Sequence, residues 1–423
     1  MSRDASCTLR ARWVLTPNRP PLADGVVTVQ HGRIRSLGTA STVDVDVDLG
    51  AAILFPGLVN AHTHLEFSLL NSPLGEHGSD FPAWIRHVLA YRAQQFAAPT
   101  DSRDDPRATA IRQGWSELTT SGVWNAGEIV TQPFSPDTYR AADFRGVLYH
   151  ERLGLSESRP QEALAELTNT LPEKGSRETW RSGLSPHAPY SVHWRLFQGM
   201  LRLARERLLP VAMHLAESEQ EIEFLKTRQG PFHQLLEELG VWNAGAWPTD
   251  LTLLDYVREL TTAPRALIVH GNYLGPTELD LIAAHREQCC VVYCPRTHSY
   301  FQHRTYPLLE LLRRSIRVAV ATDSRGSNPD LCLGRDLQYV ASQFPELSPQ
   351  ALLAMVTSSA SWGLGGESQF GGLEPGHRAE LSYVAIPTGV SAADPWTIFL
   401  AELAQSQRWR APDSTDLRGM HDA

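Results

Sequence analysis

The chain of 423 residues has no apolar run of about 18 residues, the length that a membrane-spanning helix needs. Its formal charge of -9 at pH 7 argues against a nucleic-acid binder, because contacts to phosphates need clustered Lys and Arg. The first residues, MSRDASCTLRARW, carry charges where a signal peptide has an apolar core. We therefore expect a cytoplasmic protein whose partners include neither a membrane nor a nucleic acid.

Cysteine is also scarce. The five cysteines are Cys7, Cys289, Cys290, Cys294 and Cys332. An odd number without paired spacing does not suggest a disulfide framework, which fits a reducing compartment. The chain contains no Cys-x-x-Cys pair, so we do not expect a structural zinc site built on cysteine thiolates.

The length and composition fit a large globular enzyme. Apolar residues make up 42% of the chain and charged residues 20%, which is ordinary for such a protein. The chain is too long for one ordinary domain, but it accommodates a barrel of about 250 residues and a smaller partner domain. No low-complexity linker and no short repeat divides it.

Both ends of the chain have the character of β-structure. Segments 8–17 and 25–38 show alternation, β-branched residues and turn residues, with a tight hairpin turn expected at His31-Gly32. Segment 371–387, GGLEPGHRAELSYVAIP, is similar. We predict that residues 1–56 and 367–423 form one small β-sandwich domain, the latter range including a C-terminal tail.

Between these ends, short apolar segments alternate with helical patterns. About eight such strand-helix units follow one another, for example RALIVHGNY before PTELDLIAAHREQ. Eight units indicate a (β/α)8 TIM-like barrel of the α/β class, expected over residues 57–366. In such barrels the carboxyl ends of the strands carry the chemistry. Polar residues follow the expected strands here, among them His62, His64, Glu128, His150, His187, His214, Glu217, His270 and Asp323.

The stretch GLVNAHTHLEFS suggests a metal site. His62 and His64 are two residues apart at a strand end, so their rings share a face. The alternative interpretation is that both are structural residues at a strand end, with ring nitrogens that form hydrogen bonds within the protein. His214, His270 and Asp323 end three other expected strands, so four imidazoles and a carboxylate surround one barrel mouth. These groups suit zinc, and also iron or manganese.

At this point the sequence closely resembles the amidohydrolase superfamily. The matching segments are PGLVNAHTHLE, SPHAPYS, HLAES, VHG, CPR and TDS, in that order and at strand ends. The resemblance implies one divalent metal, with zinc expected, held by His62, His64, His214 and Asp323. It places His270 close to the water on that metal. Members with two metals usually bridge them with a lysine after the fourth strand, where this chain has none.

The resemblance also implies a hydrolytic reaction. A divalent cation lowers the pKa of its water and makes hydroxide available near neutral pH. We expect Asp323 to accept the proton of that water and Glu217 to pass a proton to a ring nitrogen. His270 would stabilise the centre that the attack creates. The alternative for Glu217 is a carboxylate that stabilises the first turn of a helix.

Within the superfamily, HTHLEFS, SPHAPYSV, HLAESEQE and CPRTH most resemble the aminodeoxyfutalosine deaminases of an alternative menaquinone route. The resemblance implies a small-molecule substrate, an adenine-type nucleoside that carries a benzoate on its sugar side. Deamination of guanine or of S-adenosylhomocysteine and methylthioadenosine, and triazine hydrolysis, remain open. S-adenosylhomocysteine deaminases carry a ribose-binding Glu after the first strand, and IRHVLAYRAQQF, which follows Trp84, has no acidic residue. A catalytically inactive, scaffold-like relative of the amidohydrolases is a distant alternative. Such a protein should lack some of the metal-binding residues, and all of them are present here.

Substrate contacts are expected from His187 and Glu66, which lie in two of these motifs. A carboxylated substrate in an acidic protein needs a local cation, and a guanidinium fits a carboxylate best. We expect Arg296 in CPRTH to fill this role, with Arg325 as the second choice and a surface salt bridge as the alternative for each. The sequence leaves open whether the protein forms a homodimer.

Overall fold

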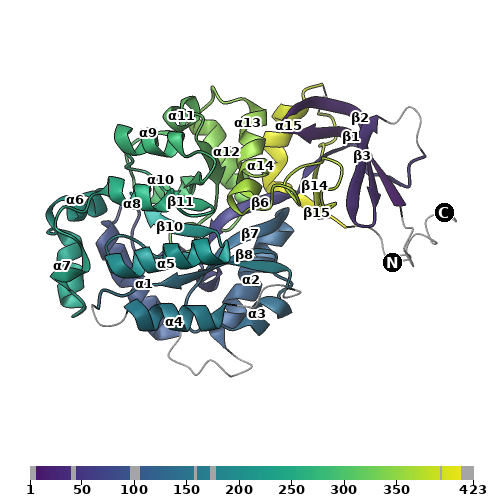
Figure 1. The fold of residues 1–423 in the computed structure, drawn as a ribbon. Coiled ribbons are helices and arrows are strands. Elements are labelled where there is room, and N and C mark those ends of the chain that lie inside the picture. The colour runs from purple at the N-terminus through teal and green to yellow at the C-terminus, as the bar shows by residue number, and fades with distance from the viewer. Residues whose placement is uncertain are drawn as a thin grey trace.

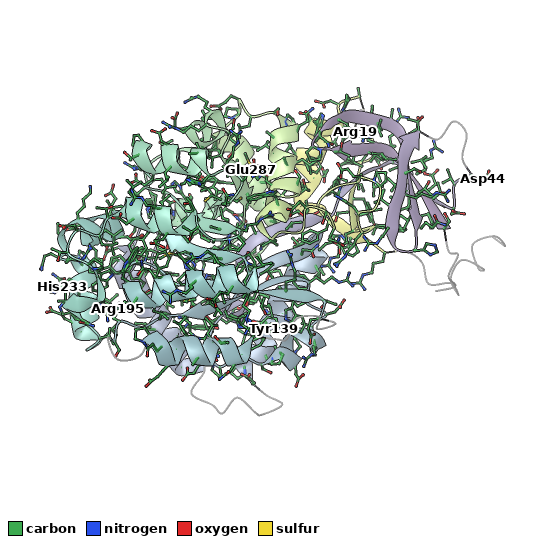
Figure 2. The ribbon with its side chains drawn as sticks, in the orientation of Figure 1. Arg19, Asp44, Tyr139, Arg195, His233 and Glu287 are labelled. Atoms are coloured by element: carbon green, nitrogen blue, oxygen red, sulfur yellow. The ribbon has the colours of Figure 1, made fainter. Side chains whose placement is uncertain are left out.

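The computed structural model describes residues 6–39, 44–95, 105–156, 160–171, 178–390 and 393–410. A closed barrel of parallel strands occupies the larger part of the molecule, and a second sheet lies to one side of it (Figure 1). Figure 2 shows Arg19 and Asp44 on the side of the second sheet and His233 at the opposite end of the molecule. None of the described helices combines the length and apolar character that crossing a membrane requires.

The barrel contains eight parallel strands in sequence order. They are β6 (Leu58–Thr63), β7 (Val123–Val130), β8 (Gly146–Arg152), β9 (Trp180–Pro186), β10 (Val211–Leu215), β11 (Ala266–His270), β12 (Cys289–Tyr293) and β13 (Arg317–Val320). A parallel bridge between Thr63 and Asp323 connects the first strand with the segment after the last. The predicted (β/α)8 fold class is confirmed.

Helices surround the barrel (Figure 1). They are α1 (Phe81–Gln95), α2 (Pro106–Thr120), α3 (Pro136–Ala141), α4 (Pro160–Thr170), α5 (Trp194–Arg207), α6 (Glu219–Thr227), α7 (Pro231–Glu238), α8 (Leu253–Leu260), α9 (Pro276–Ala284), α10 (Pro295–Tyr300), α11 (Leu308–Arg313), α12 (Leu333–Gln343), α13 (Pro349–Met355), α14 (Ser358–Gly363) and α15 (Pro395–Glu402). Proline at the first turn recurs, for example in α2, α9 and α13, and its fixed φ suits that position.

Strand residues alternate between two buried layers. Ala212, Leu267 and Val292 belong to the apolar cluster inside the barrel, whereas Val211 and Ile268 belong to the cluster shared with the helices. The period of two is that of a strand, and both of its faces are covered here. This arrangement explains why the barrel strands appear in the sequence as short, almost continuous apolar runs.

The second sheet joins the two ends of the chain. It contains β1 (Ser6–Thr16), β2 (Arg19–Gln30), β3 (Arg33–Thr39), β4 (Val47–Asp48), β5 (Ala52–Pro56), β14 (Leu381–Ala385) and β15 (Gln407–Trp409). Strand β14 pairs antiparallel with β5, with Leu381 opposite Pro56. The turn between β2 and β3 is formed by His31 and Gly32, both with positive φ, as a two-residue hairpin turn of type I′ requires.

Gly146 begins β8 at a place where the barrel leaves no room for a side chain. A Cβ there would lie 1.9 Å from the carbonyl oxygen of Ala126, and φ is +132°. We expect Gly146→Ala to lower the free energy of unfolding by about 2 kcal/mol or more, because it adds a backbone clash to an unfavourable φ. Urea unfolding followed by circular dichroism measures this. Gly38→Ala is the control, since a Cβ at Gly38 meets nothing within 4 Å, and an equal loss there would contradict the explanation.

Candidate active site

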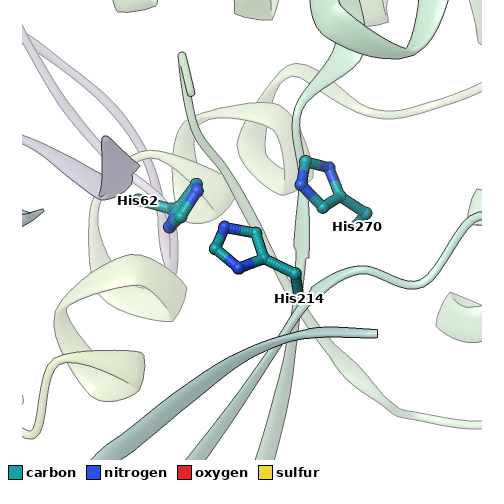
Figure 3. A group of neighbouring side chains, drawn as sticks. All are labelled: His62, His214 and His270. Carbon is teal, nitrogen blue, oxygen red and sulfur yellow. The ribbon is translucent and has the colours of Figure 1, made fainter. Parts of the chain in front are cut away.

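Five side chains meet at the carboxyl ends of four barrel strands. His62 and His64 come from the end of β6, His214 from β10, His270 from the end of β11, and Asp323 follows β13. Figure 3 shows the rings of His62, His214 and His270 turned toward one another. Nε2 of His64 lies 3.2 Å from Nε2 of His214. Oδ1 of Asp323 lies 3.6 Å from Nε2 of His62 and 3.8 Å from Nε2 of His64.

The protonation states of this cluster suit a metal ion. Burial, followed by the charge of His62, lowers the pKa of His214 to about 3. Burial likewise holds the pKa values of His64 and His270 well below their usual range. Burial opposes ionisation of Asp323, but the neighbouring imidazoles of His62, His270 and His64 outweigh it and lower the pKa of this carboxyl group. Neutral imidazoles and a carboxylate are the forms in which these residues bind metals.

Unsatisfied ring nitrogens also point to a metal. Both nitrogens of His62 are buried and have no hydrogen-bond partner among the residues that the structure describes. Nδ1 of His214 donates to the carbonyl oxygen of His187 at 3.0 Å, so Nε2 is left with its lone pair toward the cluster. Buried polar atoms without a partner are costly, and a cation among these nitrogens would satisfy them. The donor set therefore fits a divalent ion.

The backbone is strained at the strand ends that carry the site. Ala216, His270 and Asp323 have φ values of 55°, 68° and 58°, which non-glycine residues seldom adopt. In β6, Asn60 pairs with Ala126 and Thr63 with Glu128, so a bulge lies between them. Bulges and positive φ values change the direction in which side chains point, and both are concentrated at functional sites.

Glu217 reaches the cluster from the segment after β10. Its Oε1 lies 3.2 Å from Nε2 of His270. Burial, with the charges of Asp323 and Glu221, raises the pKa of Glu217 well above the usual range and so favours its protonated form. The carboxylate of Glu221 accepts hydrogen bonds from the backbone N–H groups of Ala216 at 2.8 Å and Glu217 at 2.9 Å, which holds this strained segment.

A cavity of about 350 Å³ opens above the cluster. Its polar lining includes His64, His187, His214, Glu217, His270, Asp323 and Ser324, and the remaining wall is largely apolar. His187 lines it with Nδ1 fixed at 2.6 Å from Oγ of Ser191. One end of the cavity therefore gathers the titratable groups, and the rest offers an apolar surface to a ligand.

A family model supports this interpretation of the site. The model that describes the amidohydrolase family matches residues 53–415. The chain belongs to the amidohydrolase family. It is a hydrolase that acts on carbon–nitrogen bonds.

Known amidohydrolases resemble the chain over most of its length. The aminodeoxyfutalosine deaminase of Deinococcus radiodurans is 28% identical over 336 residues, which are 75% of this chain and 75% of the relative. The 5-methylthioadenosine/S-adenosylhomocysteine deaminase of Pyrococcus furiosus is 26% identical over 377 residues, 85% of this chain and 81% of the relative. The crystal structure of a Xanthomonas campestris adenosine deaminase with bound zinc covers 98% of this chain and 96% of its own, with 20% identity and a TM-score of 0.73.

Three residues expected to contact the substrate do not line the cavity of this amidohydrolase. Nη2 of Arg296 lies 2.7 Å from Asp336 and 2.9 Å from Asp330. Arg296 is thus paired with two carboxylates, and its role as the partner of a substrate carboxylate stays a prediction. Arg325, the second choice, forms hydrogen bonds to Glu117 through Nε and Nη2, at 3.0 Å and 3.1 Å, and its role stays a prediction as well. Glu66 lies behind the cavity wall, where its Oε1 lies 2.6 Å from Nη2 of Arg92.

Two residues at the site were not anticipated. Arg92 of α1 lines the cavity, although only arginines after strands had been considered. The spacing of Phe81, Ile85 and Val88 on α1 continues to Arg92, so the helical period places this arginine on the cavity face. Glu221 stands three residues after Ser218, the helix cap, in the Ser-x-x-Glu pattern that marks a helix start.

The ligand set predicts one divalent metal per chain. In protein purified without chelators, elemental analysis should give close to one zinc ion per chain, and His62→Asn should lower this by at least about tenfold. His31→Asn removes an imidazole from the hairpin turn of the second sheet and should leave the metal content unchanged. A stoichiometry near two, or equal metal content in both variants, would contradict the mononuclear site.

Proposed function

We propose that this amidohydrolase removes the exocyclic amine of an adenine-type nucleoside by hydrolysis, with aminodeoxyfutalosine as its substrate. The observation that supports a deamination most directly is the pair of buried carboxyl groups with opposite pKa shifts. In the same cavity the imidazoles lower the pKa of Asp323, whereas burial raises that of Glu217. Opposite shifts of this kind suit one carboxyl group to act as a base and the other as an acid.

The residues can divide the proton transfers between them. A divalent ion held by His62, His64, His214 and Asp323 would supply a water of lowered pKa. Asp323, as the carboxylate, can accept a proton from that water. Glu217, as the acid, can donate a proton to the ring nitrogen beside the amine, and His270 is placed to hydrogen-bond to the oxygen that adds to the ring carbon. The proton on Asp323 then passes to the amine, the carbon–nitrogen bond breaks and ammonia leaves. The added hydroxyl group gives its proton to Glu217 and becomes the oxo group, which restores both carboxyl groups.

The relatives support a nucleoside substrate. Two of them are named for the deamination of adenine nucleosides that differ on the sugar side. The cavity extends beyond the polar cluster over an apolar wall, which has room for a group larger than the base. We favour aminodeoxyfutalosine, and the Pyrococcus relative makes methylthioadenosine and S-adenosylhomocysteine the second candidates.

A substrate screen tests the proposal. The metal-loaded protein is incubated with aminodeoxyfutalosine, methylthioadenosine, S-adenosylhomocysteine, adenosine, guanine and a chlorotriazine, and ammonia or chloride release is followed. We expect kcat/KM for aminodeoxyfutalosine to exceed each of the others by at least about tenfold, the scale that pocket contacts provide. Activity on guanine or the triazine alone would refute the nucleoside assignment, and a protein inactive on all six would refute the deaminase assignment.

The variant Glu217→Gln tests whether Glu217 is the proton donor. The amide has nearly the same size but cannot donate a carboxyl proton, so kcat should fall by about 10²-fold or more. Metal content and the melting temperature should stay close to those of the wild type. Glu219→Gln is the matched control, because Glu219 is exposed in the first turn of α6. If Glu217→Gln retains activity within a few-fold of the control, Glu217 only stabilises the helix start.

A further inference from the structure

The cavity has one arginine that can meet an anion. Arg92 is the only Lys or Arg that lines it among the residues that the structure describes. Arg152 is turned away, since its Nη1 donates to the carbonyl oxygen of Glu151 at 2.8 Å and its Nη2 lies 3.5 Å from Oγ1 of Thr170. With Arg296 and Arg325 already paired to carboxylates, any anionic part of a ligand in this cavity has Arg92 as its guanidinium partner.

The guanidinium of Arg92 is held along one edge. Nε and Nη2 lie 3.2 Å and 2.6 Å from Oε1 of Glu66, and the group lies 5.4 Å from the ring centroid of Phe67. Glu66 is itself fixed by Thr131 Oγ1 at 3.1 Å and by Arg107 Nε at 3.8 Å. Nη1 makes no hydrogen bond within the described part of the chain. The other edge of a pre-oriented guanidinium is therefore available to a ligand.

Burial opposes ionisation of two acids that lie beside Arg92. One carboxylate, Glu66, lies between the two guanidinium groups of Arg92 and Arg107. Glu128 and Glu151 are buried beside them, and burial raises the pKa of Glu128 well above its usual range and that of Glu151 to about 7. This side of the cavity therefore has a positive charge available for an anionic ligand.

The mouth of the cavity is unusually apolar. Leu89, Leu153, Leu239 and Val241 line it, and they are 36%, 48%, 47% and 47% exposed. They come from three separate segments, and they are four of the seven large apolar side chains that the described residues expose. Exposed apolar side chains gathered at one opening indicate a place where a ligand covers them. Leu89 and Arg92 are three residues apart on α1, so the apolar surface leads to the guanidinium.

We propose that Arg92 selects substrates whose sugar side carries an aromatic arm ending in a carboxylate. The arm lies across Leu89 and Leu153, and the carboxylate accepts hydrogen bonds from the free edge of Arg92. A carboxylate placed among these apolar groups without a partner would be costly, which makes the cation necessary for binding. This assignment rests on the proposed deamination, and it gives Glu66 the task of positioning Arg92.

A comparison of two substrates separates the contribution of the carboxylate to binding from that of the rest of the arm. One is an adenine nucleoside whose sugar-side arm ends in benzoate, and the other is the same compound as the benzamide. In the wild-type holoenzyme, the benzoate should be deaminated with the higher kcat/KM. Arg92→Met should lower kcat/KM for the benzoate by about 30-fold or more, mainly through KM, the scale for truncating one partner of a buried charge pair. The benzamide should change by less than about threefold.

Three further variants complete the test. Arg92→Met leaves Glu66 without its main partner, so the double variant Arg92→Met with Glu66→Gln removes the orphaned charge and should show the same selective loss. Arg92→Lys should recover part of the benzoate activity. Arg202→Met, at an exposed position of α5, should leave both substrates unchanged.

The outcomes distinguish this inference from the proposed function. Equal losses for benzoate and benzamide, or a wild type without preference between them, would refute the role of Arg92 while deamination itself stands. A wild-type holoenzyme that releases no ammonia from either compound would refute the proposed function instead. Leu153→Asn should raise KM for both arm-bearing substrates but not for adenosine, and an equal effect on adenosine would refute the placement of the arm.

Discussion

The site depends on the burial of several imidazoles that compete for protons, and three of their ring nitrogens, both of His62 and Nδ1 of His64, have no hydrogen-bond partner among the described residues. Nε2 atoms of His64 and His214 lie 3.2 Å apart, so both cannot carry a proton, and burial excludes the charged forms. Such a cluster opposes folding unless a cation satisfies it, because each nitrogen without a partner is costly. The barrel tolerates it because the surrounding backbone is held firmly. Tyr306 donates to the carbonyl oxygen of His270 at 2.9 Å, and Asn272 donates to that of Glu217 at 2.8 Å.

Much of this site could be predicted because strand geometry determines it. Parallel strands end at one edge of a barrel, so residues that follow apolar runs, such as His214 and Asp323, are brought together whatever the loops do. The spacing of two between His62 and His64 places both at the end of the same strand, β6. The positive φ values at Ala216 and His270 could not be predicted, because no residue type there demands them.

The substrate contacts could not be predicted in the same way. Arg296 follows a strand as expected, but Asp330 and Asp336 lie 34 and 40 residues further along the chain, and no period in the sequence links them to it. Arg92 belongs to α1, a helix that packs across the barrel mouth by tertiary contacts. Its Trp84 donates to the carbonyl oxygen of Gly326 at 3.0 Å, in the loop after β13. The position of a side chain on such a helix depends on these tertiary contacts, so charge and strand order alone could not point to Arg92.

The distances within the cluster decide which carboxyl group is the acid. Burial alone would raise the pKa values of both Asp323 and Glu217. Asp323 has the imidazoles of His62 and His64 within 3.8 Å, and they favour its charged form. Glu217 has one imidazole, His270, and it faces the negative charge of Asp323. Ionisation of Asp323 therefore opposes ionisation of Glu217, and under the proposed deamination this makes Asp323 the base and Glu217 the acid.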